Sequence, residues 1–105
     1  MKIYIAGKIT GLPRERMLHH FAEAENYLRQ EGYTVLNPTV LPEGLDYEGY
    51  MHICFAMIDT CDKVYLLNNW QDSPGAKREA EYAFEKRKRI VCEEKELWKD
   101  KKLRG

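Results

Sequence analysis

The stretch Lys63–Ala83, which reads KVYLLNNWQDSPGAKREAEYA, decides the fold of this chain. It begins with an apolar run, Val64–Leu67, typical of a buried strand, and continues through a polar loop, Asn68–Asp72, into a helix. Ser73 is suited to cap this helix, and Pro74 to its first position, where the missing N–H removes no hydrogen bond. We therefore expect a strand, a tight corner and a helix in immediate succession.

The start of this helix also indicates a binding site. Gly75 has no side chain to shield the free amides of the first turn, which attract anions. Glu79 follows about one turn later, where its carboxylate could face the crevice above the strand end. The alternative is that the corner only begins a helix and that Glu79 is a solvated surface acid. The position of the other loops decides between these interpretations.

Length and composition predict a single globular domain, 1–105. The 105 residues are 44% hydrophobic and 32% charged, with 17 basic and 17 acidic side chains and no formal net charge. This balance argues against nucleic-acid binding through a broad basic surface. No apolar run is long enough to cross a membrane, so we expect no membrane partner.

The cysteines and histidines predict neither disulfides nor a metal site. Cys54, Cys61 and Cys92 are odd in number and unpaired in spacing, and no signal peptide is recognisable, which together indicate reduced thiols in a cytoplasmic protein. The three histidines form no metal-ligand spacing with them. The loop Gly7–Gly11 matches neither a Walker phosphate loop nor a dinucleotide fingerprint, so no cofactor is expected.

Strands are expected to alternate with helices along the chain. The expected strands are Lys2–Ala6, Tyr33–Leu36, Val64–Leu67 and Arg89–Cys92, and the expected helices run from Pro13 to Gly32, from about Tyr47 to Cys61, and from the Ser73 corner to near Lys88. The inward face of the second helix is assigned to Tyr50, Ile53 or Cys54, Met57 and Cys61. A charged tail, 93–105, follows, for which a helix is one alternative.

This alternation predicts an α/β fold, a Rossmann/flavodoxin-like three-layer sandwich with right-handed crossovers. The expected parallel sheet has four strands in the order 2-1-3-4, and ligands of such sheets bind where the strand order reverses. The loops Gly7–Gly11 and Asn68–Gly75 meet there, which places Asp72, Ser73 and Glu79 around one crevice. The long loop Thr39–Asp46 either covers a ligand or is an exposed connection without a role in binding.

Four segments in order carry a family resemblance: Tyr4–Gly11, Asn37-Pro38, Cys61–Tyr65 and Asp72–Ala83. They resemble a family of small, mostly phage and bacterial proteins, DUF4406, over almost the whole chain to about Cys92. More distantly, the chain is similar to nucleoside 2-deoxyribosyltransferases and nucleoside 5′-monophosphate N-glycosidases. That second similarity rests on Tyr-x-x-Gly in the first strand and Gly-x-x-x-Glu-x-x-Tyr-Ala in the third helix.

The resemblance implies catalytic roles for Glu79 and Tyr4. In those enzymes a helix glutamate attacks the anomeric carbon and displaces the base, and a strand tyrosine orients it. The resemblance further implies that Gly75 lies one turn before the nucleophile, and that Asp72 and Ser73 contact the sugar or phosphate. A fixed carboxylate suits an oxocarbenium-like transition state, and the helix start and the phenol are expected to keep it ionised.

The remaining expected ligand contacts come from the loops and the second helix. Gly7 and Lys8 offer backbone amides, and Trp70 either stacks on a base or packs locally. Cys54 falls where the enzymes carry the aspartate that protonates the leaving base, and a thiol is a poorer acid for that purpose. Glu81 replaces a glycine of the enzymes, which is a second departure.

Three functions compete. The preferred one is an N-glycosidase or 2-deoxyribosyltransferase acting on a nucleoside or nucleotide. The second is a non-catalytic module that holds a nucleotide or nucleotide-derived signal in the same crevice. The third is a structural or partner-binding protein, for which Trp98 in the tail is the only support. The small sheet and the tail favour a homo-oligomer, a dimer or larger.

Overall fold

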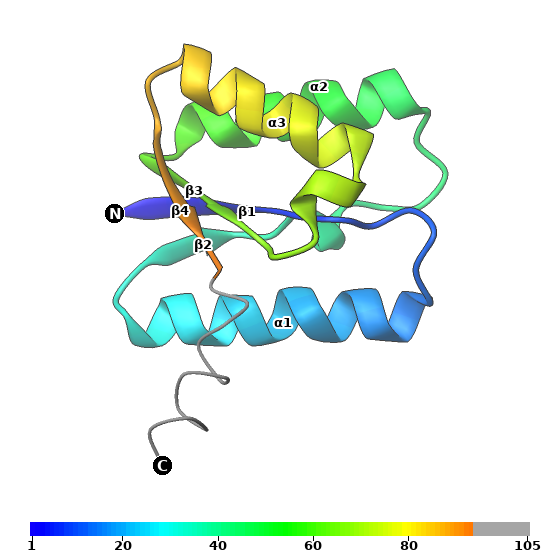
Figure 1. Cartoon of the computed structure of the whole chain (residues 1–105), viewed down its shortest axis with the longest axis horizontal. Coiled ribbons are helices and arrows are strands. Elements are labelled where there is room, and N and C mark those ends of the chain that lie inside the picture. The colour runs from blue at the N-terminus through cyan, green and yellow to red at the C-terminus, as the bar shows by residue number, and fades with distance from the viewer. Residues whose placement is uncertain (94–105) are drawn as a thin grey trace.

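The structure, a computed structural model, describes residues 1–93; the expected tail from residue 94 onward lies outside the described residues. Figure 1 shows the arrangement of its elements. The strands are β1 (Lys2–Ala6), β2 (Thr34–Leu36), β3 (Lys63–Leu66) and β4 (Arg89–Cys92), the helices are α1 (Arg14–Gln30), α2 (Tyr47–Thr60) and α3 (Pro74–Glu85), and two short 3-10 turns are η1 (Pro38–Val40) and η2 (Trp70–Asp72).

The four strands form one parallel sheet in the order β2-β1-β3-β4, as the sequence predicts. Helix α1 covers one face, and α2 and α3 cover the other, which makes three layers (Figure 1). This is a flavodoxin-like architecture. Its switch point lies between β1 and β3, where α1 leaves on one side of the sheet and α3 on the other.

Alternation along β1 divides the core into two apolar clusters. Ile3 and Ile5 pack with the α1 stripe, whose buried residues are Met17, Phe21, Ala24 and Leu28, as expected. Tyr4 and Ala6 face the opposite layer and pack against α2 and α3. The side chain of Tyr4 therefore points to the same layer as α3, which is necessary for it to meet Glu79.

The expected inward face of α2 is confirmed in part. Cys54 and Cys61 are buried as expected, and Tyr50 and Met57 are partly buried against the same cluster. Met51 and Ile58 are also buried, although the pattern did not assign them to this face. The helix is apolar on most sides, so its sequence pattern does not fix which side turns inward. Packing against both the sheet and α3 decides which side of α2 turns inward.

The ends of α3 show one confirmed and one wrong expectation. Ser73 caps the helix, since its Oγ accepts a hydrogen bond from the Ala76 amide at 3.1 Å. The helix ends at Glu85 rather than near Lys88. Arg87 adopts a left-handed conformation with φ of 60°, and the Lys88 amide bonds back to the Ala83 carbonyl at 2.9 Å. This is the geometry of a helix C-terminal motif and turns the chain into β4.

The carboxyl ends of β1 and β3 are joined tightly. The Leu67 amide donates to the Ala6 carbonyl at 2.8 Å, and the Lys8 amide donates to Asn69 Oδ1 at 3.0 Å. Gly7 lies against the Leu67 side chain, where a Cβ would stand only 2.5–2.9 Å from its carbons. The two loops at the switch point are thus fixed to each other.

Candidate active site

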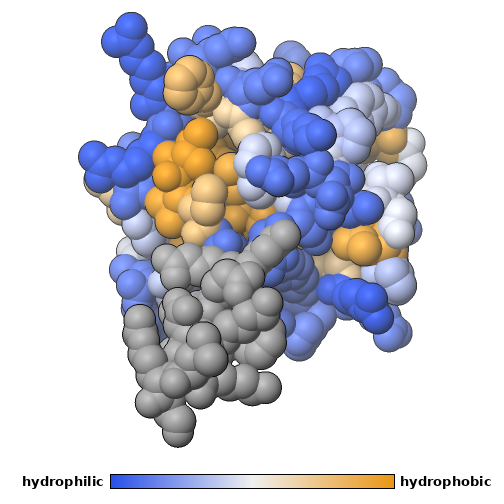
Figure 2. Space-filling model, in the orientation of Figure 1, coloured by the Kyte–Doolittle hydropathy of each residue, from blue (hydrophilic) through white to orange (hydrophobic). Residues whose placement is uncertain are grey.

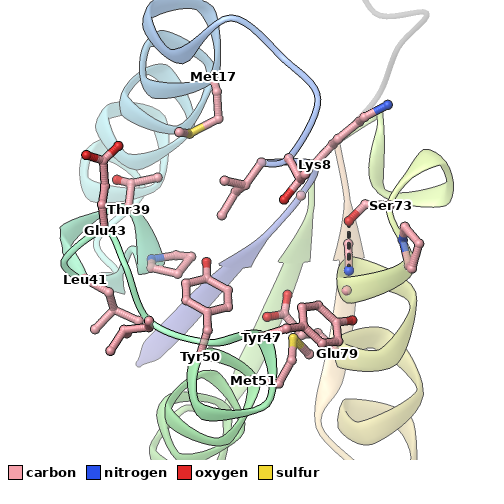
Figure 3. Close-up of a pocket in the computed structure, with 18 of the residues that line it drawn as sticks. Lys8, Met17, Thr39, Leu41, Glu43, Tyr47, Tyr50, Met51, Ser73 and Glu79 are labelled. Atoms are coloured by element: carbon pink, nitrogen blue, oxygen red, sulfur yellow. Dashed lines mark hydrogen bonds between the residues drawn. The ribbon is translucent and has the colours of Figure 1, made fainter.

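A pocket of about 830 Å³ opens at the switch point, beyond the carboxyl ends of β1 and β3. Four segments surround it: the β1–α1 loop, the loop after β2, the first turns of α2, and the start of α3 (Figure 3). The residues of the loop after β2 that line it include Thr39 and Leu41–Leu45. This long loop therefore covers the pocket, which was one of its two expected roles.

Glu79 and Tyr4 meet at the floor of this pocket. The Tyr4 hydroxyl donates to Glu79 Oε2 at 2.8 Å, although the two residues come from opposite ends of the chain. Tyr4 is completely buried and does not line the pocket, whereas Glu79 lines it and is 4% exposed. The carboxylate is therefore presented to the pocket and the phenol holds it from behind.

The carboxyl of Glu79 is harder to ionise than the sequence suggests. Burial raises its pKa to about 7, although hydrogen bonds with Tyr4 and Cys54 favour the ionised form. Desolvation exceeds these contributions. Glu79 also lies beyond the first turn of α3, where the field of the helix start has largely decayed. The helix start and the phenol, which were expected to keep this acid ionised, therefore do not offset the effect of burial on its pKa.

Cys54 lies behind Glu79 and outside the pocket. It is completely buried and belongs to the same apolar cluster as Tyr4. Burial, followed by the nearby Glu79 carboxylate, raises the pKa of its thiol to about 12. The expectation that Cys54 contacts a ligand is not supported, because a buried protonated thiol reaches Glu79 but not the pocket.

The other expected residues of the two loops do line the pocket: Gly7, Lys8, Asp72, Ser73 and Gly75. Two details differ from expectation. The Lys8 amide is bonded to Asn69 and is not available to a ligand. A Cβ on Gly75 would lie 3.6 Å from both the Tyr47 hydroxyl and the Met51 sulfur, so side chains of α2 stand over the start of α3.

Trp70 does not reach this pocket. It lies in η2, packs against the core cluster on the α2 and α3 side, and lines a second hollow with Phe84 and Ile90. Figure 2 shows an apolar patch on the face where α3 and β4 come together. Trp70 therefore packs locally, as one of its two alternatives has it, and it does not line the pocket that contains Glu79.

The pocket also contains residues that the sequence did not single out for a site. Tyr47, Tyr50 and Met51 enter from α2, and Arg14 of α1 forms a 2.6 Å ion pair with Glu43 of the covering loop. The length of the loop before α2 could have indicated them. A long loop at the carboxyl end of a strand lies beside the switch point, so the helix residues that directly follow it lie there too.

Within residues 1–93, no group of three or more His, Cys, Asp or Glu side chains is placed to hold a metal ion. No helix in the same part of the chain is long and apolar enough to span a membrane.

The fold and the site together define a flavodoxin-like α/β protein with a buried carboxylate at its switch point. The chain belongs to the DUF4406 family, a domain of unknown function, whose family model matches residues 1–92. No curated protein matches the chain.

Two solved structures share its fold with a TM-score of 0.69 each. One is a 2-deoxyribosyltransferase from Bacillus psychrosaccharolyticus, 23% identical, with 88% of this chain covering 71% of that one. The other is a 2-desoxiribosyltransferase from Leishmania mexicana, 19% identical, with 87% of this chain covering 62% of that one.

Proposed function

We propose that this protein cleaves the N-glycosidic bond of a nucleoside or nucleotide, as a hydrolase or as a 2-deoxyribosyltransferase, with Glu79 as the nucleophile. The observation that carries the proposal is the 2.8 Å bond from the Tyr4 hydroxyl to Glu79 Oε2 at the floor of the pocket. A carboxylate fixed in this way attacks a defined point of a bound ligand. The shared fold of the two deoxyribosyltransferases supports the same chemistry.

The proposed step replaces one bond by another at the anomeric carbon. An ionised Glu79 oxygen bonds to this carbon, the carbon–nitrogen bond breaks, and its electron pair leaves with the base, which takes a proton from water in the pocket. Water or a second base then displaces Glu79 from the sugar. Tyr4 is a positioning residue in this scheme, since it contacts Glu79 and not the pocket.

Chromatography of free base tests the proposal, after incubation with ribo- and 2′-deoxyribonucleosides and their 5′-monophosphates. We expect wild type to release base and Glu79→Gln to lower the rate by at least about a hundredfold, because an amide is not a nucleophile of this kind. Glu81→Gln is the matched control, since Glu81 lies on the same helix but is exposed and outside the pocket. Base release that persists in Glu79→Gln would exclude the nucleophile.

A nucleotide-binding module without catalysis is the second candidate, and Cys54 favours it. This residue stands where a proton donor for the leaving base is expected, yet its thiol is buried and its pKa is raised to about 12. No base release, combined with a nucleotide that raises the melting temperature, would select this candidate. A salt-sensitive shift on DNA without a nucleotide effect would contradict both candidates.

Three further expectations accompany this proposal: one domain over 1–105, a homo-oligomer of two or more chains, and a cytoplasmic location. Light scattering coupled to size exclusion tests the second. A mass equal to one chain would contradict it.

A further inference from the structure

Tyr50 carries an unusual hydroxyl for a pocket residue. It lies in the first turn of α2 and lines the pocket with Glu79 (Figure 3). Its hydroxyl oxygen is shielded from solvent and forms no well-aligned hydrogen bond with any other described residue, 1–93. It is the one buried side-chain polar atom in that part of the chain with this property.

An unpartnered buried hydroxyl requires an explanation. Most buried side-chain polar atoms are hydrogen-bonded, and leaving one unsatisfied costs about 1–3 kcal/mol. The buried Tyr4 hydroxyl follows that rule and donates to Glu79 at 2.8 Å, and at the surface the Tyr82 hydroxyl donates to Asp59, also at 2.8 Å. Tyr33 accepts a bond from Lys63. The Tyr50 hydroxyl differs from these three, and Tyr50 is also the one of the four tyrosines that lines the pocket with Glu79 and belongs to α2.

The two phenols near Glu79 lie on different sides of it. Tyr4 is completely buried and bonds the carboxylate from the core, so a ligand in the pocket does not reach it. Tyr50 lies close to Glu79 and to the Cys54 thiol, which is only a weak hydrogen-bond partner, and it stands among the pocket-lining side chains. Figure 3 shows its ring rising from α2 into the pocket. Of the two tyrosines, only Tyr50 lines the pocket.

We propose that the Tyr50 hydroxyl hydrogen-bonds the 2′-hydroxyl of a ribosyl substrate and makes the site prefer ribonucleosides or ribonucleotides to their 2′-deoxy forms. This inference rests on the proposed function, in which Glu79 addresses the anomeric carbon. The carbon next to it bears the 2′-hydroxyl, which is therefore the sugar hydroxyl nearest to the Glu79 carboxylate. A phenol and an alcohol each donate and accept, so the two groups satisfy each other.

The expected discrimination follows from the unsatisfied state of the phenol. A ribosyl substrate gives the phenol a hydrogen-bond partner that the analogue without the 2′-hydroxyl cannot supply, so the ribo member gains this bond on binding. A 2′-deoxy substrate would leave the Tyr50 hydroxyl as it is in the free protein. The preference therefore selects ribosyl substrates within the class that Glu79 is proposed to cleave, and it favours the hydrolase over the 2-deoxyribosyltransferase.

The test compares wild type, Tyr50→Phe and Tyr27→Phe on matched ribo and 2′-deoxy nucleosides and 5′-monophosphates. We expect wild-type kcat/KM to favour the ribo member by at least about tenfold, and Tyr50→Phe to lower that ratio toward one by slowing the ribo substrates. Tyr27 lies on α1, half exposed and outside the pocket, so its loss of a hydroxyl should leave the ratio unchanged.

Melting temperatures separate this inference from the proposed chemistry. If no substrate releases base, the N-glycosidase proposal fails, and the sugar preference is then measured as the shift produced by ribose 5-phosphate against 2-deoxyribose 5-phosphate. We expect a larger shift with the ribo sugar in wild type and equal shifts in Tyr50→Phe. Equal treatment of both sugars by wild type in turnover and in melting, or an undiminished preference in Tyr50→Phe, would overturn the inference.

The stability of Tyr50→Phe without ligand provides a last check. Removing an unpaired hydroxyl should leave the melting temperature unchanged or raise it. A clear fall would show that the hydroxyl already has a partner in the free protein, which would contradict the reason for assigning it to a ligand.

Discussion

Glu79 is the residue on which most of the site depends, and burial rather than a neighbouring charge determines the pKa of its carboxyl. It has a phenol and a thiol as immediate polar neighbours, and both are protonated at neutral pH because burial raises their pKa values. Neither supplies a positive charge to offset the desolvation of the carboxylate. The acid consequently titrates near pH 7 instead of near 4.5.

This shift predicts that wild type loses stability as the pH rises from about 4.5 to 7. In that window the folded protein keeps a proton on Glu79 that the unfolded chain has released, so stability present below pH 4.5 is lost as the pH passes through the folded pKa. A raised pKa of this size corresponds to roughly 3 kcal/mol. Urea unfolding across the window measures it.

Glu79→Gln is the reference for that measurement, because glutamine does not titrate. The difference in unfolding free energy between wild type and the variant should change across pH 4.5–7 and stay constant above it. Parallel curves for the two proteins would show that Glu79 titrates normally in the fold. The same ionisation should make base release rise with pH up to about 7.

Among the elements, the contact between the ends of β1 and β3 places the two loops of the pocket. The β1–α1 loop crosses the Leu67 side chain at Gly7, where a Cβ would be 2.5–2.9 Å from Leu67 carbons. Real Cβ atoms do not approach so closely, so any larger residue must displace the loop or Leu67. A glycine is therefore required here for close approach and not for a special backbone angle.

Gly7→Ala is expected to destabilise the protein by about 1–3 kcal/mol, since an added methyl group overpacks a buried contact. Chemical unfolding measures the loss. Gly75→Ala is the matched control: its Cβ would meet neighbours at 3.6 Å, an ordinary contact, in a helix that favours alanine. Combining Gly7→Ala with Leu67→Ala should cost less than the sum of the two, because both act on one contact.

In the whole molecule, Glu93 connects three elements near the end of β3: the edge strand β4, the β3–α3 loop and helix α1. Directly after β4, its Oε1 accepts a hydrogen bond from the Asn68 amide at 2.8 Å and lies 2.8 Å from His20 Nε2 on α1. The strand at the sheet edge, the β3–α3 loop and the α1 layer are thus joined by one carboxylate. This position keeps the loop before Trp70 fixed to the opposite face of the sheet.

The ion pair of His20 and Glu93 predicts a pH window of stability. Bonding with Glu93 raises the pKa of His20, and bonding with His20 and the Asn68 amide lowers the pKa of Glu93 despite its partial burial. The contribution of Glu93 is lost as the pH falls through its lowered pKa. That of His20 is present below its usual value near 6.5 and is lost as the pH rises through its raised pKa.

His20→Gln should therefore cost about 1 kcal/mol near pH 6 and little near pH 9, as thermal unfolding at both values would show. His19→Gln is the control on the neighbouring position, because the His19 side chain is 74% exposed and its ion pair is with Glu23, which is 68% exposed. An equal loss from His20→Gln at both pH values would mean that packing, not charge, gives the residue its role.

Local patterns in the sequence were sufficient for most of the elements and for the switch point, whereas the meeting of Tyr4 with Glu79 was expected from the family resemblance. Lys2–Ala6 and Arg89–Cys92 are strands at the predicted bounds, Ser73 caps α3, and the sheet has the predicted order. Strand alternation and the crossover rule act through the backbone alone, so they determine which residues converge at the switch point.

Tertiary packing decided what the sequence did not determine. Trp70 lines the second hollow, Tyr50 lines the pocket, and Cys54 is buried behind Glu79. The positions of these side chains depend on how the helices pack against each other and on the sheet. The pKa of Glu79 depends on the same packing, since desolvation is a property of all surrounding atoms and not of neighbours along the chain. The sequence determined where the acid lies, and the packed interior determined its proton affinity and the side chains that face a ligand.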